Sequence, residues 1–172
     1  MGDAFARLAL PVQRFHSLSG RVALHGSVLT EAPPSRMTRW LAACLGAPRE
    51  ATQGLIRFEL HAEAGRETWT RHFPRQVMRS QMRRDGAHLC ESLGPVCLRF
   101  QLVERDGALL MQLAAMDILG LPCPRWLLPS VHAVETGRDG ALHFDVRAGW
   151  PWLGTVSAYR GHLLLPVHGD AP

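Results

Sequence analysis

The amino-acid sequence predicts an α+β fold: a large curved antiparallel β-sheet or open β-barrel of about eight strands, with two N-terminal helices packed on its concave side. Three observations support this. Apolar and polar residues alternate with period two through most of the chain after residue 50. Asp-Gly pairs at 85–86, 106–107 and 139–140 are typical of tight hairpins between antiparallel strands. Helical spacing is confined to the first quarter of the chain.

Two segments are expected to be helical. The first covers residues 11–18, because Pro11 is tolerated in the first turn of a helix. The second covers residues 36–45, with Ser35 as N-cap and Gly46 at the C-cap. Its apolar face consists of Met37, Trp40, Leu41, Cys44 and Leu45.

The period-two stretches define the strands. They cover residues 21–30, 55–63, 69–73, 76–83, 96–104, 109–118, 131–135, 141–147 and 155–165. Residues 120–129 contain three prolines and are expected to cross from one edge or end of the sheet to another, because proline cannot sit inside a sheet. We interpret residues 1–172 as a single domain whose tail, 167–172, is frayed.

Composition excludes several classes of function. The net charge is +4, but all 19 basic residues are arginines scattered along the chain, so we expect no nucleic-acid partner. No segment approaches the roughly 20 apolar residues of a membrane-spanning helix. The N-terminus has no basic start followed by an apolar region, so secretion is not indicated and a cytoplasmic protein is expected.

Metal and cofactor sites are not predicted. The four cysteines, at positions 44, 90, 97 and 123, form no Cys-x-x-Cys pair, and we expect them to be reduced and largely buried. The nine histidines form no His-x-x-x-His or His-Glu-x-x-His pattern, and the chain has no Gly-x-Gly-x-x-Gly loop.

Several short signatures occur together along nearly the whole chain. They are Trp69-x-Arg71-x-Phe73, Ser80, Glu91-x-x-Gly94-Pro95, Gly120-Leu121-Pro122-x-Pro124 with Pro129, Glu135, Phe144-Asp145-Val146, and Gly154 with Tyr159-x-Gly161. In this order they resemble the bacterial domain-of-unknown-function family 4166, whose members occur alone or appended to NADP-binding domains similar to saccharopine dehydrogenase. The resemblance implies no activity. It suggests a helper role, either holding a substrate for an enzyme or docking to one.

Strand parity places charged residues among the apolar ones. If Trp69 and Phe73 face inward, so does Arg71, and Glu91 faces inward with Leu89 and Leu93. The same rule places Glu104, Asp117 and Glu135 on the apolar face, although these lie at strand ends, where emergence into solvent is the simpler interpretation. A buried charge needs a partner, so we expect Arg71 to pair with Glu91 or Glu135, with contact to a bound polar head group and catalysis as alternatives.

Two functions follow as hypotheses. The first is a non-catalytic binding module for a small hydrophobic or lipid-like ligand, with a candidate site formed by Trp69, Arg71, Phe73, Glu91, Phe100, Glu135 and Tyr159. The alternative is an interaction or regulatory domain that docks to a dehydrogenase-like partner through Trp126 and Leu127. An enzyme that uses Glu91 or Glu135 as general base ranks last.

Overall fold

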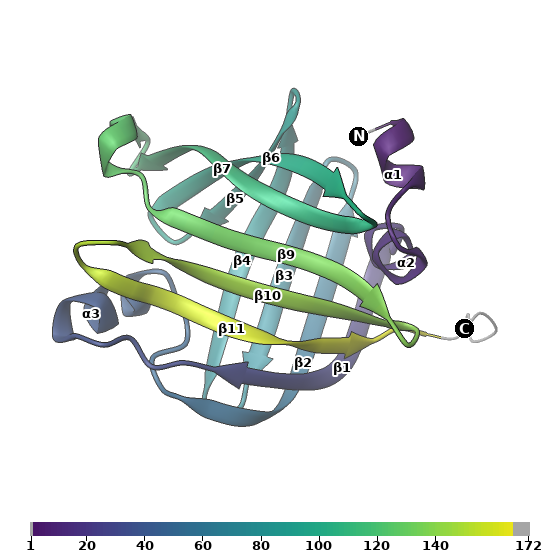
Figure 1. Ribbon diagram of the computed structural model, residues 1–172, viewed down its shortest axis with the longest axis horizontal. Helices are drawn as coiled ribbons and strands as arrows, with labels where there is room; N and C mark the ends of the chain where they lie inside the picture. The colour runs from purple at the N-terminus through teal and green to yellow at the C-terminus, as the bar shows by residue number, and fades with distance from the viewer. Residues whose placement is uncertain (1, 167–172) are drawn as a thin grey trace.

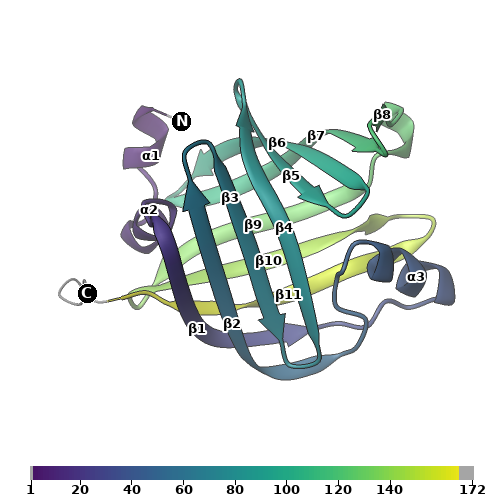
Figure 2. The same cartoon turned by 180° about the vertical axis from the view of Figure 1, so that it is seen from behind.

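A computed structural model describes residues 2–166 and shows a closed antiparallel β-barrel with short helices at its two ends (Figures 1 and 2). The helices are α1 (Asp3–Ala6), α2 (Leu10–His16), α3 (Arg36–Cys44) and the 3₁₀ turn η1 (Arg125–Leu127). The strands are β1 (Gly20–Thr30), β2 (Thr52–Glu63), β3 (Arg66–Phe73), β4 (Gln76–Asp85), β5 (His88–Leu93), β6 (Val96–Arg105), β7 (Ala108–Ile118), β8 (Leu121–Pro122), β9 (Ser130–Arg138), β10 (Ala141–Trp150) and β11 (Gly154–Leu164).

The sheet closes on itself through ten strands. Their order is β6-β5-β4-β3-β2-β1-β11-β10-β9-β7, and β6 also pairs with β7, which completes the ring. The two-residue β8 adds to β7 outside the ring. The antiparallel barrel is confirmed, but the count of about eight strands is wrong. The predicted strand ranges omit β5, although strand parity places its residues Leu89, Glu91 and Leu93 on one face.

One seam of the barrel is weaker than the others. β7 and β9 pair only through Leu109↔Glu135 and Leu110↔Val134, at the end of the barrel where β7 begins. A small core cluster of Phe100 on β6, Met111 on β7 and Ala133 on β9, with Leu113 and Val131 packed against it, lies next to this seam.

Helix α2 covers one end of the barrel. Val12 and Phe15 point into the core, and the Phe15 ring packs against Phe58 and Trp69 with ring centroids 5.4 and 5.5 Å apart. Helix α3 lies at the opposite end (Figures 1 and 2). The two predicted helices are therefore present, but they cover the two ends of a closed barrel and not the concave side of an open sheet.

Helix α3 begins at the predicted residue, but the side that it turns towards the barrel is not the predicted apolar face. Ser35 is its N-cap and forms a capping box with Thr38. Ala42 is buried, whereas three members of the predicted apolar face are exposed: Met37, Trp40 and Cys44. The expectation that the cysteines are largely buried is also wrong, since only Cys90 is fully buried. Composition alone does not determine which side of this short helix faces the barrel.

Two Asp-Gly turns have the expected geometry. Asp106 and Gly107 have φ of 51° and 79°, and Asp139 and Gly140 have φ of 51° and 74°. Positive φ at both central positions is the type I′ pattern, which matches the twist of a hairpin. In the third hairpin Asp85 still belongs to β4, so Gly86 and Ala87 form the turn.

A bulge in β7 reverses the expected orientation of Asp117. Arg99 is opposite Ala115 while Phe100 is opposite Leu113, so Ala114 is an extra residue. Beyond it Met116 is buried, and the prediction that Asp117 shares the apolar face is wrong. Asp117 instead forms an ion pair with Arg99.

Two further expectations concern the ends and the surface. The predicted frayed tail, 167–172, lies outside the described residues. Within residues 2–166, no helix has the length and apolar character needed to cross a membrane.

Core packing predicts a large loss of stability for Leu109→Ala. Leu109 is 2% exposed beside the β7–β9 pairing. Truncating such a leucine removes buried apolar surface and leaves a void, so the free energy of unfolding should fall by about 2–5 kcal/mol in urea denaturation. Leu121→Ala, at a side chain 72% exposed on β8, is the matched control and should change it by less than about 0.5 kcal/mol. Equal effects of the two substitutions would contradict the packing described here.

Candidate functional site

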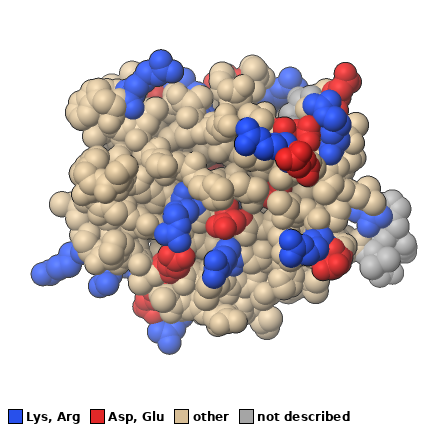
Figure 3. All heavy atoms as spheres, viewed as in Figure 1, with Lys and Arg blue, Asp and Glu red and all other residues tan. Residues whose placement is uncertain are grey.

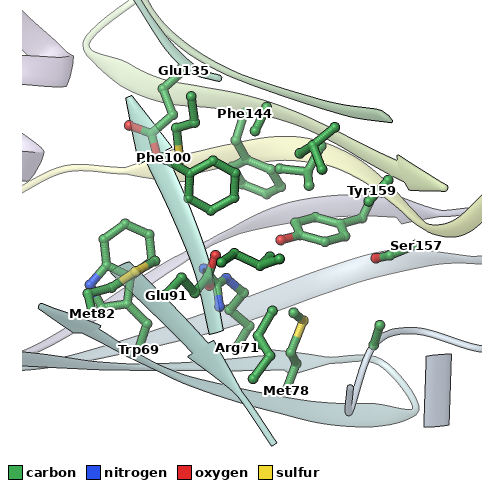
Figure 4. A pocket seen from close by; sticks show the side chains of 18 of the residues that line it. Trp69, Arg71, Met78, Met82, Glu91, Phe100, Glu135, Phe144, Ser157 and Tyr159 are labelled. Carbon is green, nitrogen blue, oxygen red and sulfur yellow. Dashed lines mark hydrogen bonds and ion pairs between the residues drawn. The ribbon is translucent and has the colours of Figure 1, made fainter. Parts of the chain in front are cut away.

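The interior of the barrel contains a partly open cavity of about 110 Å³. Its walls come from strands on both sides of the barrel and from the segment that follows α3. The apolar lining residues include Leu45, Ala47, Ile56, Phe58, Trp69, Met78, Met82, Leu93, Leu98, Phe100, Met111, Val131, Ala133, Leu142, Phe144, Val146 and Leu163. Polar side chains of Arg71, Glu91, Glu135, Ser157 and Tyr159 interrupt this surface (Figure 4).

Arg71 and Glu91 form a buried ion pair on adjacent parts of the wall. The Arg71 side chain lies on β3, donates to the Ser80 hydroxyl at 3.0 Å and contacts the Glu91 carboxylate at 3.4 Å. The guanidinium also lies 5.1 Å from the centroid of the Trp69 ring, within the range of a cation–π contact. Three neighbours thus compensate for the loss of water around one buried cation.

Glu135 has a different partner. Its carboxylate, on β9, lies 2.6 Å from Nε2 of His16 on α2, and both groups are shielded from solvent. Figure 4 shows Glu135 apart from the Arg71–Glu91 pair, at another side of the cavity. Of the two predicted partners of Arg71, Glu91 is confirmed. The simpler interpretation of Glu135, emergence into solvent at a strand end, is wrong because α2 covers it.

The His16–Glu135 contact changes the protonation of the histidine. Burial by itself lowers the pKa of His16. The charge of Glu135, its hydrogen bond and the charge of the more distant Glu67 raise the pKa, and together they outweigh the effect of burial. The resulting pKa is above the ordinary value. This rise favours the protonated imidazolium beside Glu135.

Two hydroxyl groups in the wall lack partners among the described residues. The Ser157 Oγ atom is buried without a hydrogen bond. The Tyr159 hydroxyl points across the cavity towards Arg71 and Glu91, and no hydrogen bond joins it to a described residue (Figure 4). Burial raises the pKa of Tyr159, so its hydroxyl stays protonated and able to donate.

Six of the seven predicted site residues line the cavity. These are Trp69, Arg71, Glu91, Phe100, Glu135 and Tyr159. The seventh, Phe73, is buried outside the lining and packs its ring against Tyr159, with centroids 5.2 Å apart. Sequence reasoning missed Ser157 and the three lining methionines, although Ser157 has the same strand parity as Tyr159 and this signal was available.

Glu104 shares the inward parity but stays at the barrel end. It accepts hydrogen bonds from Arg7 at 2.8 Å and from the Gly107 amide at 3.1 Å. These two contacts lower the pKa of Glu104. Its role is to hold the segment after α1 against the β6–β7 turn.

The predicted partner-contact residues lie outside the barrel, at the α3 end. Trp126 is 81% exposed on η1, and Leu127 is half-buried. The Leu127 carbonyl accepts a hydrogen bond from the Trp150 indole at 2.8 Å, which fixes η1 against β10. The described residues contain no group of three or more His, Cys, Asp or Glu side chains placed to hold a metal ion.

Comparisons with known proteins identify a family without a known function. The model of a domain of unknown function, DUF4166, matches residues 8–163. A protein of unknown function from the DUF3598 family of Nostoc punctiforme is similar in structure, with a TM-score of 0.44 and 15% identity. That match covers 86% of this chain and 47% of the other, so this chain spans about half of its length. No curated protein matches the chain.

The buried ion pair predicts strong coupling between Arg71 and Glu91. Arg71→Met leaves an unpaired carboxylate inside the barrel, and Glu91→Met leaves an unpaired guanidinium, so each should lower the free energy of unfolding by about 3–5 kcal/mol. The double variant should recover much of this loss, because it buries no unpaired charge. The exposed pair Arg75–Glu50 is the control, with an expected coupling below about 1 kcal/mol. Additive losses at Arg71 and Glu91 would rule out the pairing.

The raised pKa of His16 predicts a pH-dependent contribution to stability. The folded protein holds this proton more tightly than the unfolded chain, so the contribution is complete below about pH 6.5 and is lost as the pH rises through the folded pKa. His16→Gln should therefore lower the free energy of unfolding more at mildly acidic than at alkaline pH, as measured by urea denaturation. His88→Gln, on the solvent face, is the control and should show no such difference. A loss for His16→Gln that is independent of pH would contradict this assignment.

Proposed function

We propose that this chain, which belongs to the DUF4166 family of domains of unknown function, is a binding module that holds a small, mostly apolar ligand inside its barrel. One observation carries the proposal: an apolar cavity contains two hydroxyl groups, those of Ser157 and Tyr159, without hydrogen-bond partners among residues 2–166. A folding core gains nothing from such groups, because a buried polar group without a hydrogen bond costs about 1–3 kcal/mol. A ligand with one polar end would satisfy them.

The volume of the cavity limits the size of the ligand. Pockets for drug-sized molecules measure about 300–1,000 Å³, whereas an apolar cavity of about 150 Å³ accepts benzene. At about 110 Å³ the interior matches a single ring or a short branched chain. Met78, Met82 and Met111 line the wall, and flexible thioether side chains can move to make room for a longer, lipid-like chain.

The polar side chains of the wall support a position for the polar end of the ligand. Arg71 uses one terminal nitrogen for Ser80 and the other for Glu91, and its five N–H groups leave further donors for a ligand oxygen. The Tyr159 hydroxyl points to the same region (Figure 4). Glu91 already balances the charge of Arg71, so a neutral hydroxyl or carbonyl fits better than a strong anion.

The β7–β9 seam supplies a route to the cavity. Only two residue pairs hold these strands together, and Met111 on β7 with Val131 and Ala133 on β9 line the cavity next to this seam. Moving side chains requires less free energy than breaking a ladder of backbone hydrogen bonds in a dry interior. A ligand would enter here without unfolding the rest of the sheet.

The methionines allow a direct test of ligand binding. In protein with ¹³C-labelled Met methyl groups, phenol should produce saturable shifts at Met78, Met82 and Met111, which line the cavity. Met37, exposed on α3, and Met116, buried outside the lining, are controls within the same spectrum. Phenol should bind more tightly than benzene because its hydroxyl can bond in the cavity, and dodecanol tests a lipid-like chain with a neutral polar end. Equal shifts at all methionines, or none, would overturn the proposal.

Two variants separate cavity binding from surface binding. Tyr159→Phe removes the hydroxyl that points to the polar end of the ligand, so it should weaken phenol binding by about 0.5–1.5 kcal/mol and leave benzene binding unaffected. Ala133→Leu adds volume to the wall and should abolish binding of both probes. Unchanged binding in Ala133→Leu would place the probes outside the barrel. Gently purified protein examined by native mass spectrometry identifies a ligand carried from the cell.

A further inference from the structure

Exposed apolar side chains gather at the α3 end of the barrel. We call them the apolar rim: Met37, Trp40, Leu119, Leu121, Trp126 and Trp152, each 57–81% exposed. They come from α3, from the segment between β7 and η1, and from the turn between β10 and β11. Figures 1 and 2 both place these elements at the same end, and Figure 3 shows the surface over β8 and the β10–β11 turn as mostly uncharged.

The rim is held in place by contacts between its parts. The Trp150 indole donates to the Leu127 carbonyl at 2.8 Å, and the Trp150 ring lies 6.1 Å from the Trp152 ring. Pro34, just before α3, sits beside Gly154, where an added Cβ would come within 3.0 Å of the proline ring. These contacts join η1, the β10–β11 turn and the start of α3. The exposure of the rim therefore belongs to a fixed arrangement of three segments.

The charged side chains near the rim that form no ion pair with a described residue are all arginines. Arg36 and Arg39 on α3 and Arg125 on η1 are exposed, and none forms an ion pair with a described residue. The acidic side chains nearby are already engaged: Glu31 by Arg147, and Asp117 by Arg99. The rim thus combines projecting tryptophans with unpaired guanidinium groups.

We propose that the apolar rim docks this end of the barrel onto an anionic lipid surface. Tryptophan side chains favour the boundary between head groups and acyl chains, and arginines are attracted to anionic head groups. The rim residues come from a helix and two loops, whereas a protein interface requires close shape complementarity over one surface. A bilayer accommodates separate projecting side chains. The proposal concerns the outer surface and does not depend on what the cavity binds.

Vesicle sedimentation tests the proposal. The full chain should sediment with vesicles of equal parts phosphatidylcholine and phosphatidylglycerol, and binding should weaken with added salt. Binding to pure phosphatidylcholine should be much weaker. Tryptophan fluorescence should shift to the blue on binding, because rim indoles leave water. Failure to sediment with the anionic vesicles would overturn the proposal.

Matched variants at the two ends of the barrel locate the contact. Trp126→Ala with Trp152→Ala should abolish sedimentation, and Arg36→Gln with Arg39→Gln should weaken it roughly 25-fold, about fivefold for each arginine. The controls lie at the opposite end: Leu10→Ala with Leu164→Ala, and Arg83→Gln with Arg84→Gln. All these side chains are exposed, and thermal unfolding by circular dichroism verifies that each variant is folded.

The pattern of results separates lipid binding from other causes. Equal losses in rim and control variants would show attraction by overall charge and would overturn the assignment of the rim. If the chain binds no vesicle but the Trp126→Ala, Trp152→Ala variant abolishes self-association seen by light scattering, the rim is a protein interface and the lipid proposal is wrong. Loss of vesicle binding in the rim variants alone supports it.

Discussion

Closure of the sheet into a ring, in which the first strand β1 pairs with the last strand β11, is the constraint on which the rest of the structure depends. A closed barrel has an interior that water reaches poorly, and a charge there is stable only with a partner. Arg71 meets this condition with Glu91, Ser80 and the Trp69 ring, and Glu135 meets it with His16. Helix α2 therefore does more than cover the end of the barrel, since it carries His16, the partner of the buried Glu135 on β9.

Much of the interior was predictable from strand parity. Alternation assigned Trp69, Arg71 and Glu91 to the inside, and all three line the cavity. This inference works because side chains on a regular strand point strictly to alternate faces. It needs only the residues of one strand, and most strands here are regular. The Arg71–Glu91 pair followed from the same rule together with the free energy of burying an unpaired charge.

The failures share a physical cause: they depend on contacts between distant segments. The bulge at Ala114 moves Asp117 to the outer face. It arises from the pairing of β7 with β6, and the alternation of residues within β7 does not indicate it. The His16–Glu135 contact joins residues 119 positions apart. The orientation of α3, with Trp40 outward, depends on which side of a short helix meets the barrel. Closure itself also requires the first and last strands of the ring to meet, which no single segment encodes.

Because only two residue pairs join β7 to β9, the barrel can open between these two strands. If the two residue pairs of that seam separate, every other ladder of the ring can persist, because β7 remains bonded to β6 and β9 to β10. The product is a single twisted sheet with β7 and β9 as its edges. The open curved sheet that the sequence predicts and the closed barrel are thus two shapes of one strand order, and they differ by the shortest ladder in the ring.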